Sequence, residues 1–218
     1  STRARSAAQR AHSPLRDLID GLVYVWRTPH IQAGMWLACL VNLTAFPLTN
    51  ALLPYVAKNI YHIDQTGLGM LVASFAFGAL LGSIVLALVR RAVPSGRLMI
   101  AASLIWHTLL LAFAHTTTPA TGMALLVLAG FAQSLSMVSL ALMLLRTSQA
   151  HIRGRVMGVR MLAIYSLPIG LTVAGSLIPI YGYPATASGY AILGIVLTAL
   201  IGWFWRRSVI APAGAANA

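Results

Sequence analysis

The sequence has 218 residues, of which 59% are hydrophobic and 8% are charged, and its formal net charge at pH 7 is +12. An ordinary soluble domain carries about 25% charged residues, so the composition excludes one. The basic residues follow the ends of hydrophobic segments instead of forming a patch of their own, and we therefore expect no nucleic-acid partner.

The N-terminal residues 1–30 are polar and rich in arginine, which predicts a cytoplasmic linker with disordered residues 1–12. Ser13 and Pro14 form a typical N-cap and first-turn pair. From there apolar and charged residues separate onto two sides of a helix, which predicts an amphipathic helix over about 14–28 lying along the membrane surface. Pro29 favours a break after this helix; the alternative is a helix that continues into the first span.

Six long apolar segments follow, and each is about as long as the 20 helical residues that cross about 30 Å of hydrocarbon. Continuous rather than alternating hydrophobicity favours helices over a β-barrel. We therefore predict an all-α polytopic membrane protein with six transmembrane helices, in which two groups of three spans form inverted repeats. The predicted spans are residues 31–56, 67–89, 98–115, 120–145, 157–181 and 184–205.

Basic residues gather before the first span and after the second, fourth and sixth, whereas the alternate loops hold only Lys58. The positive-inside rule then places the arginine-rich side, both termini and the tail 206–218 in the cytoplasm. The expected location is the bacterial cytoplasmic membrane. Arg153 and Arg155 are expected to lack acidic partners within the chain, and so to meet lipid phosphates, helix C-terminal carbonyls or acids elsewhere.

Prolines interrupt two spans, where each removes a helical hydrogen bond and favours a kink. Transporters open and close at such kinks, although proline is also common in ordinary membrane helices. The candidate gating kinks are Pro47, Pro54, Pro168 and Pro179. Small residues on one helical stripe predict close helix packing. These stripes are Ser74, Gly78 and Gly82; Gly170, Ala174 and Gly175; and Gly194, Thr198 and Gly202.

Polar side chains within the spans are costly in lipid and are therefore expected to face the bundle interior or a wet substrate cavity. The candidates are Asn42, Thr44, Asn50, Gln133 and Ser136. His107 is the ionisable residue nearest the middle of a span, which makes it a possible proton or polar relay. The alternative is a neutral histidine that bonds to a neighbouring helix and has a structural role.

Enzymatic chemistry has little support in the sequence. All three acidic residues lie outside the predicted spans and the histidines are scattered, so we expect no catalytic residues, no metal and no cofactor. An intramembrane protease using Ser103 and His107 is the enzyme alternative. A self-contained, channel-like oligomer of six-helix chains is the other alternative.

Two segments of the chain are recognisable. The stretch LRDLIDGLVYVWRTPHIQAGM, residues 15–35, resembles the linker helix before the seventh span of drug exporters in the major facilitator superfamily. The stretch IRGRVMGVRMLAIYSLPIGLTVAG, residues 152–175, resembles a cytoplasmic loop and helix of the branch with macrolide efflux pumps and enterobactin exporters. Within this stretch, the residues that correspond to the cytoplasmic loop are Arg153, Gly154 and Arg155.

The resemblance implies a twelve-helix transporter of which this chain is the C-terminal half, with alternating access and export of a drug or siderophore by proton antiport. Its partners would be the lipid bilayer, the N-terminal six-helix half, a small-molecule substrate and protons. The superfamily's loop signature is only partly present, because its aspartate is absent; the residues that fit are Arg90, Arg91, Gly96 and Arg97. A titrating carboxylate would then lie on the other half, or His107 would carry the proton.

Overall fold

The computed structural model describes residues 14–89, 95–148 and 152–206, and within these ranges the chain forms helices without any strand. The predicted disordered segment 1–12, most of the tail 206–218, and the loop residues Arg90 and Arg91 lie outside the described residues. The helices are α1 (Pro14–Arg27), α2 (Pro29–Phe46), α3 (Leu53–Tyr55), α4 (Gln65–Leu88), α5 (Ser95–Phe113), α6 (Pro119–Thr147), α7 (Arg153–Leu162), α8 (Ser166–Tyr181) and α9 (Tyr183–Phe204).

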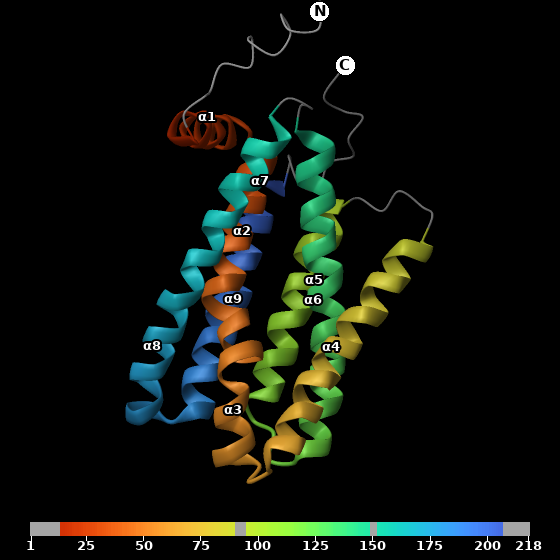
Figure 1. The fold of residues 1–218 in the computed structure, drawn as a ribbon, viewed down its shortest axis with the longest axis vertical. Coiled ribbons are helices and arrows are strands. Elements are labelled where there is room, and N and C mark those ends of the chain that lie inside the picture. Colours follow the sequence, from red (N-terminus) through yellow and green to blue (C-terminus); the bar gives the residue numbers. More distant parts are fainter. Residues whose placement is uncertain (1–13, 90–94, 149–151, 207–218) are drawn as a thin grey trace, which may run out of the picture.

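The longest helical stretches run along the bundle axis (Figure 1). Six stretches in the described residues are long and apolar enough to cross a membrane, which confirms the predicted all-α polytopic fold. They are Pro29–Ile60, Gln65–Leu88, Ser95–Phe113, Pro119–Thr147, Arg153–Tyr181 and Tyr183–Phe204. The fifth starts four residues before the predicted span at 157, because α7 continues into α8 through the short 3-10 turn Ala163–Tyr165.

Helix α1 lies across one end of the bundle (Figure 1). Thr28 joins it to α2 with an extended backbone, φ −120° and ψ 94°, so the helix does not run on into the first long stretch. One side of α1 packs on α7, with Gly21 and Val25 buried, while Ile19 and Trp26 are exposed. Helix α1 therefore has a buried side and an exposed apolar side, and its location at a membrane surface stays a prediction.

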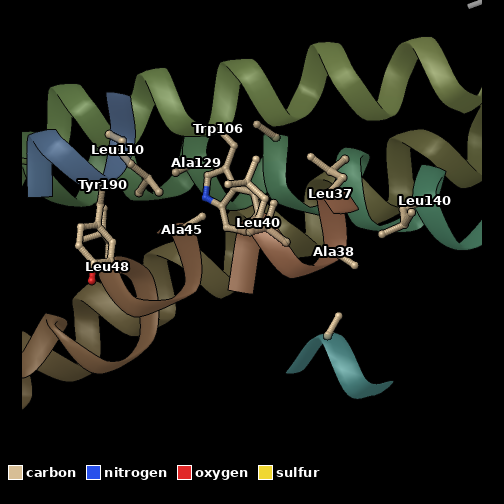
Figure 2. Close-up of a cluster of buried hydrophobic side chains, with 14 of the residues drawn as sticks. Leu37, Ala38, Leu40, Ala45, Leu48, Trp106, Leu110, Ala129, Leu140 and Tyr190 are labelled. Atoms are coloured by element: carbon tan, nitrogen blue, oxygen red, sulfur yellow. The ribbon is translucent and has the colours of Figure 1, made fainter. Parts of the chain in front are cut away.

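The core of the bundle lies between α2, α5, α6 and α9. Trp106 of α5 is fully buried and points toward α2, where Leu40 and Ala45 lie (Figure 2). Its ring meets Phe46 edge to face, with centroids 5.2 Å apart, a favourable aromatic geometry. The first long stretch, Pro29–Ile60, is the most buried of the six, at 61% of its most apolar window. It is therefore the central helix of the bundle.

Helices α4 and α6 approach each other backbone to backbone. A side-chain carbon added at Gly78 would collide with the carbonyl of Val127, and one added at Gly130 with the carbonyl of Phe75. The sequence stripe that includes Gly78 therefore has the predicted packing role. The expectation is wrong for Gly175, which is exposed on α8 with no atom within 4 Å of an added carbon.

Candidate functional site: a polar junction around a break in the central helix

The regular hydrogen bonding of α2 ends at Pro47, in the middle of the first long stretch. Proline has no amide hydrogen, so the carbonyl four residues earlier, that of Leu43, loses its helical partner. A π-helical turn, Pro47–Ala51, follows, and the Leu52 amide donates to the Pro47 carbonyl at 3.0 Å. A second π-helical turn covers Val56–Ile60. Such turns are frequent at functional sites in membrane and soluble helices.

Helix α8 packs against the freed carbonyl. An added side-chain carbon at Gly170 would collide with the Leu43 carbonyl oxygen and would lie 3.0 Å from the Pro47 ring. The carbonyl of Gly170 in turn accepts a hydrogen bond from the Tyr190 hydroxyl of α9 at 2.6 Å. Three helices therefore meet beside the break in α2, and the contact depends on the absence of a side chain at Gly170.

His107 of α5 joins α2 on the other side of the break. Its Nε2 lies 2.9 Å from the Thr44 hydroxyl and its Nδ1 lies 2.8 Å from the Ser103 carbonyl. Because a carbonyl only accepts, Nδ1 carries the hydrogen, and in the neutral ring Nε2 accepts from Thr44. Both residues are 0% exposed. Each ring nitrogen of a neutral His107 thus has a possible partner within the bundle, and Nε2 is satisfied when the Thr44 hydroxyl donates to it.

The ring of His107 packs against α9 at Gly194. A side-chain carbon at Gly194 would collide with Cδ2 and Nε2 of the histidine, so the glycine makes room for it. The Thr44 hydroxyl also lies 2.7 Å from the carbonyl of Leu40 and, with one hydrogen, donates to that carbonyl or to the histidine. Thr44, His107 and Gly194 form a junction that links α2, α5 and α9. At its centre the Thr44 hydroxyl has two alternative acceptors.

The Ser103 side chain does not pair with His107. The histidine bonds to the backbone carbonyl of Ser103, and the Ser103 hydroxyl is buried with no hydrogen-bond partner in the described residues. A serine nucleophile needs its base within hydrogen-bond reach, so this arrangement gives no support to an intramembrane protease.

The other polar residues predicted for a cavity lie apart from this junction. Ser136 is buried and donates to the Met99 carbonyl at 3.1 Å, which joins α6 to α5. Asn42 donates to the Ala38 carbonyl of its own helix at 2.8 Å. Gln133 is half-buried and Asn50 is exposed. Of the five predicted cavity residues, only Thr44 belongs to the junction.

The candidate gating prolines have different surroundings. Pro47 is buried at the break, whereas Pro54 is exposed in the short helix α3. Pro168 and Pro179 are exposed in α8, and the helix continues through Pro179 to Tyr181. Ser166 stabilises the start of α8, since its hydroxyl lies 2.6 Å from the Ala163 carbonyl and 2.9 Å from that of Cys39.

Two clefts lie between α2, α8 and α9, and of the five predicted cavity residues Thr44 lines one of them. One, of about 620 Å³, is lined by residues such as Ile169, Thr186 and Leu193. The other, of about 400 Å³, lies nearer α1 and is lined by residues such as Trp36 and Leu200. Leu43 lines both, so they adjoin at the break in α2. Sequence reasoning missed their apolar lining because these residues have the same pattern as residues that face lipid.

The loop arginines give one correction. Arg155 has an acidic partner within the chain, because its Nη1 lies 3.3 Å from Oδ2 of Asp20 in α1. The expectation was wrong because residues 135 positions apart in sequence meet only when α1 folds onto α7. Arg153 instead donates to the carbonyl of Ser148, at the C-terminal end of α6, at 3.1 Å.

The other loop residues singled out by the sequence lie within α7 and α5. Gly154 lies exposed in α7 with open space around it. Gly96 is buried and Arg97 is exposed in the first turn of α5. The described residues contain no cluster of three or more histidine, cysteine or acidic side chains around one point.

Comparison with known proteins identifies a family. Residues 35–217 match the profile of the Major Facilitator Superfamily. No curated protein matches the chain. The matched range runs from within α2 to beyond α9 and includes every residue of the junction.

Proposed function

Because the chain belongs to the Major Facilitator Superfamily, we propose that it is the C-terminal half of a secondary active transporter that exports a small molecule by alternating access. The family and the six apolar helices make it a multi-pass membrane protein with a role in transport. A drug or a siderophore is the proposed substrate class, and the bacterial cytoplasmic membrane is the proposed location.

The observation that carries this proposal is the break in α2. In alternating access one bundle rocks or gates against the other, and a helix that bends at a defined place provides such a gate. The most buried helix of the bundle has its hydrogen bonding interrupted at Pro47, and the Thr44 hydroxyl beside it has two alternative acceptors. A helix with these features bends at a defined place at low energetic cost.

Two further features support a partner half. The most apolar windows of α4 and of the α7–α8 stretch are only 17% and 22% buried, against 61% for the first stretch. Large apolar side chains such as Phe77 and Ile169 are exposed on them. An N-terminal half would cover part of these two faces, and lipid would cover the rest.

The proposed coupling is to proton entry, and we assign the titrating group to the N-terminal half. The six apolar stretches contain no aspartate or glutamate. A charged histidine deep in a membrane bundle is costly without an acidic partner. Since the contacts of His107 already satisfy its neutral form, we assign it a structural role at the junction.

Export by the intact gene tests the proposal directly. Cells that lack their main efflux systems would express the full gene, and accumulation of a macrolide, a siderophore and a cationic dye would be measured. We expect lower accumulation of at least one compound, restored when a protonophore collapses the proton gradient. Unchanged accumulation of every compound, or a coding sequence that starts at Ser1, would count against the proposal.

The assignment of His107 has its own control. Replacing His107 with glutamine keeps a hydrogen-bonding side chain but removes the titratable ring. If the group that carries the proton lies on the other half, His107→Gln should retain proton-dependent export at a reduced rate. A variant that folds normally but exports without proton dependence would instead make His107 the proton carrier.

A further inference from the structure

The cleft of about 400 Å³ between α2, α8 and α9 has an almost wholly apolar wall. Two lining residues have polar side chains. The hydroxyl of Ser166 already donates to backbone carbonyls, and the thiol of Cys39 is only weakly polar. Leu197 and Leu200 of α9 form one side, and Leu40 and Leu43 of α2 the other. Such a wall accepts a hydrocarbon chain and offers no partner for a polar solute.

Aromatic rings surround the end of this cleft nearest α1. Trp36, Phe204 and Trp205 line the cleft, and Trp26 of α1 meets Trp36 edge to face with centroids 6.2 Å apart. Tryptophan is enriched where a membrane protein crosses the boundary between hydrocarbon and headgroups. The aromatic end of the cleft is therefore at headgroup depth, and the apolar wall below it is at the depth of the acyl chains.

Two arginines directly follow aromatic residues of this end in the sequence. Arg206 follows Trp205 directly and its guanidinium carbon lies 4.7 Å above the ring of Trp203. Arg27 is exposed and follows Trp26 directly. Stacking on an aromatic face leaves the edge of a guanidinium free to bind the oxygens of a phosphate. An apolar cleft, and arginines that follow the aromatic residues at its end in the sequence, are the two parts that an anionic phospholipid requires.

We propose that this cleft binds one anionic phospholipid from the leaflet on the arginine-rich side. An acyl chain lies along Leu43, Leu197 and Leu200, and the headgroup phosphate lies between Arg27 and Arg206. The adjoining cleft beyond Leu43 gives the chain room to extend deeper into the membrane. The bound lipid fills the space between α8 and α9 beside the break in α2. This inference does not depend on the direction or the substrate of transport.

Native mass spectrometry of the intact transporter tests the proposal. The protein would be equilibrated with equal amounts of phosphatidylglycerol and phosphatidylcholine and then released from detergent. We expect one phosphatidylglycerol to be retained in preference, and Arg27→Gln and Arg206→Gln each to reduce the preference about fivefold, as expected for one arginine near an anionic lipid. Arg146→Gln, at an exposed arginine ending α6, is the matched control and should leave the preference unchanged.

Cys39 provides an independent measure of where the lipid lies, because it lines the cleft and is half-buried. In nanodiscs of phosphatidylglycerol, alkylation of Cys39 by N-ethylmaleimide, followed at the peptide level, should be at least about threefold slower than in phosphatidylcholine. The Arg27→Gln/Arg206→Gln variant should lose this protection. Equal retention of both lipids, equal losses in Arg146→Gln, or unprotected Cys39 would each overturn the proposal.

Discussion

Helices α4 and α6 touch through their backbones, whereas α2 meets α8 and α5 through a freed carbonyl, a shared hydroxyl and a histidine. At the first contact, Gly78 and Gly130 bring each helix against a carbonyl of the other. At the second, the contacts are the Leu43 carbonyl against Gly170 and the Thr44 hydroxyl against His107. Clefts lie beside the second contact, and none of the residues lining them comes from α4 or α6.

The contact between α4 and α6 is fixed, whereas the contact of α2 with α8 and α5 can change. Close backbone packing has a narrow energy minimum, because a small displacement loses many van der Waals contacts at once. Beside Pro47 the hydrogen bonding of α2 is already interrupted, and the Thr44 hydroxyl can donate to either of two acceptors. We therefore infer that α4 and α6 move as one body, and that α2 bends beside α8. Substitutions at these contacts test this difference.

The largest effect should come from the fixed contact. Gly78→Ala places a methyl group against the Val127 backbone and should destabilise the fold by about 3 kcal/mol. Gly69→Ala, in the same helix with no atom within 4 Å of the added carbon, is the matched control and should be neutral or slightly stabilising. Thermal unfolding of the purified protein measures both. Equal melting temperatures for the two variants would mean that α4 and α6 are not tightly packed.

A smaller loss of stability, with a large loss of transport, is expected at the contact between α2 and α8. Gly170→Ala forces α8 away from the Leu43 carbonyl at an expected cost of about 2 kcal/mol. Gly175→Ala, five residues further along α8 and on its exposed side, should be neutral. Export rate and melting temperature together test this. A Gly170→Ala variant with normal export would show that this contact has no part in transport.

The histidine junction should respond to the loss of one hydrogen bond. Thr44→Val keeps the volume of the side chain but leaves Nε2 of His107 without a donor, at an expected cost of about 1–2 kcal/mol. Thr44→Ser keeps the hydroxyl and should retain most of the stability. Chemical denaturation of both variants measures the difference. Equal loss in the two variants would attribute the effect to packing of the methyl group and not to the hydrogen bond.

The smallest effect is expected between α1 and α7. The ion pair of Asp20 and Arg155 is partly exposed, with side-chain exposures of 47% and 26%. Such pairs contribute about 0.5 kcal/mol and weaken with salt. A double-mutant cycle of Asp20→Asn and Arg155→Gln isolates the pair from other contacts of Arg155. A coupling energy that does not fall between low and high salt would contradict an exposed ion pair.

The sequence predicts the fold because span length, continuous hydrophobicity and proline positions are local properties. The break at Pro47 belongs to this class. The junction does not, because Thr44 and His107 are 63 residues apart and either residue alone is explained as well by a bond to its own helix. The pair of Asp20 and Arg155 spans 135 residues and was missed for the same reason. The apolar lining of the clefts was missed because residues that line an apolar cleft and residues that face lipid are of the same types.

Hydrogen–deuterium exchange of the intact transporter in nanodiscs tests the central claim, that one side of the bundle is fixed and the other bends. Backbone amides around the break, residues 48–60, should exchange at least about tenfold faster than those at the packed centre of α4, residues 71–82. Local opening requires less free energy where helical hydrogen bonds are already interrupted. Equal protection of the two segments, or faster exchange in α4, would contradict the account.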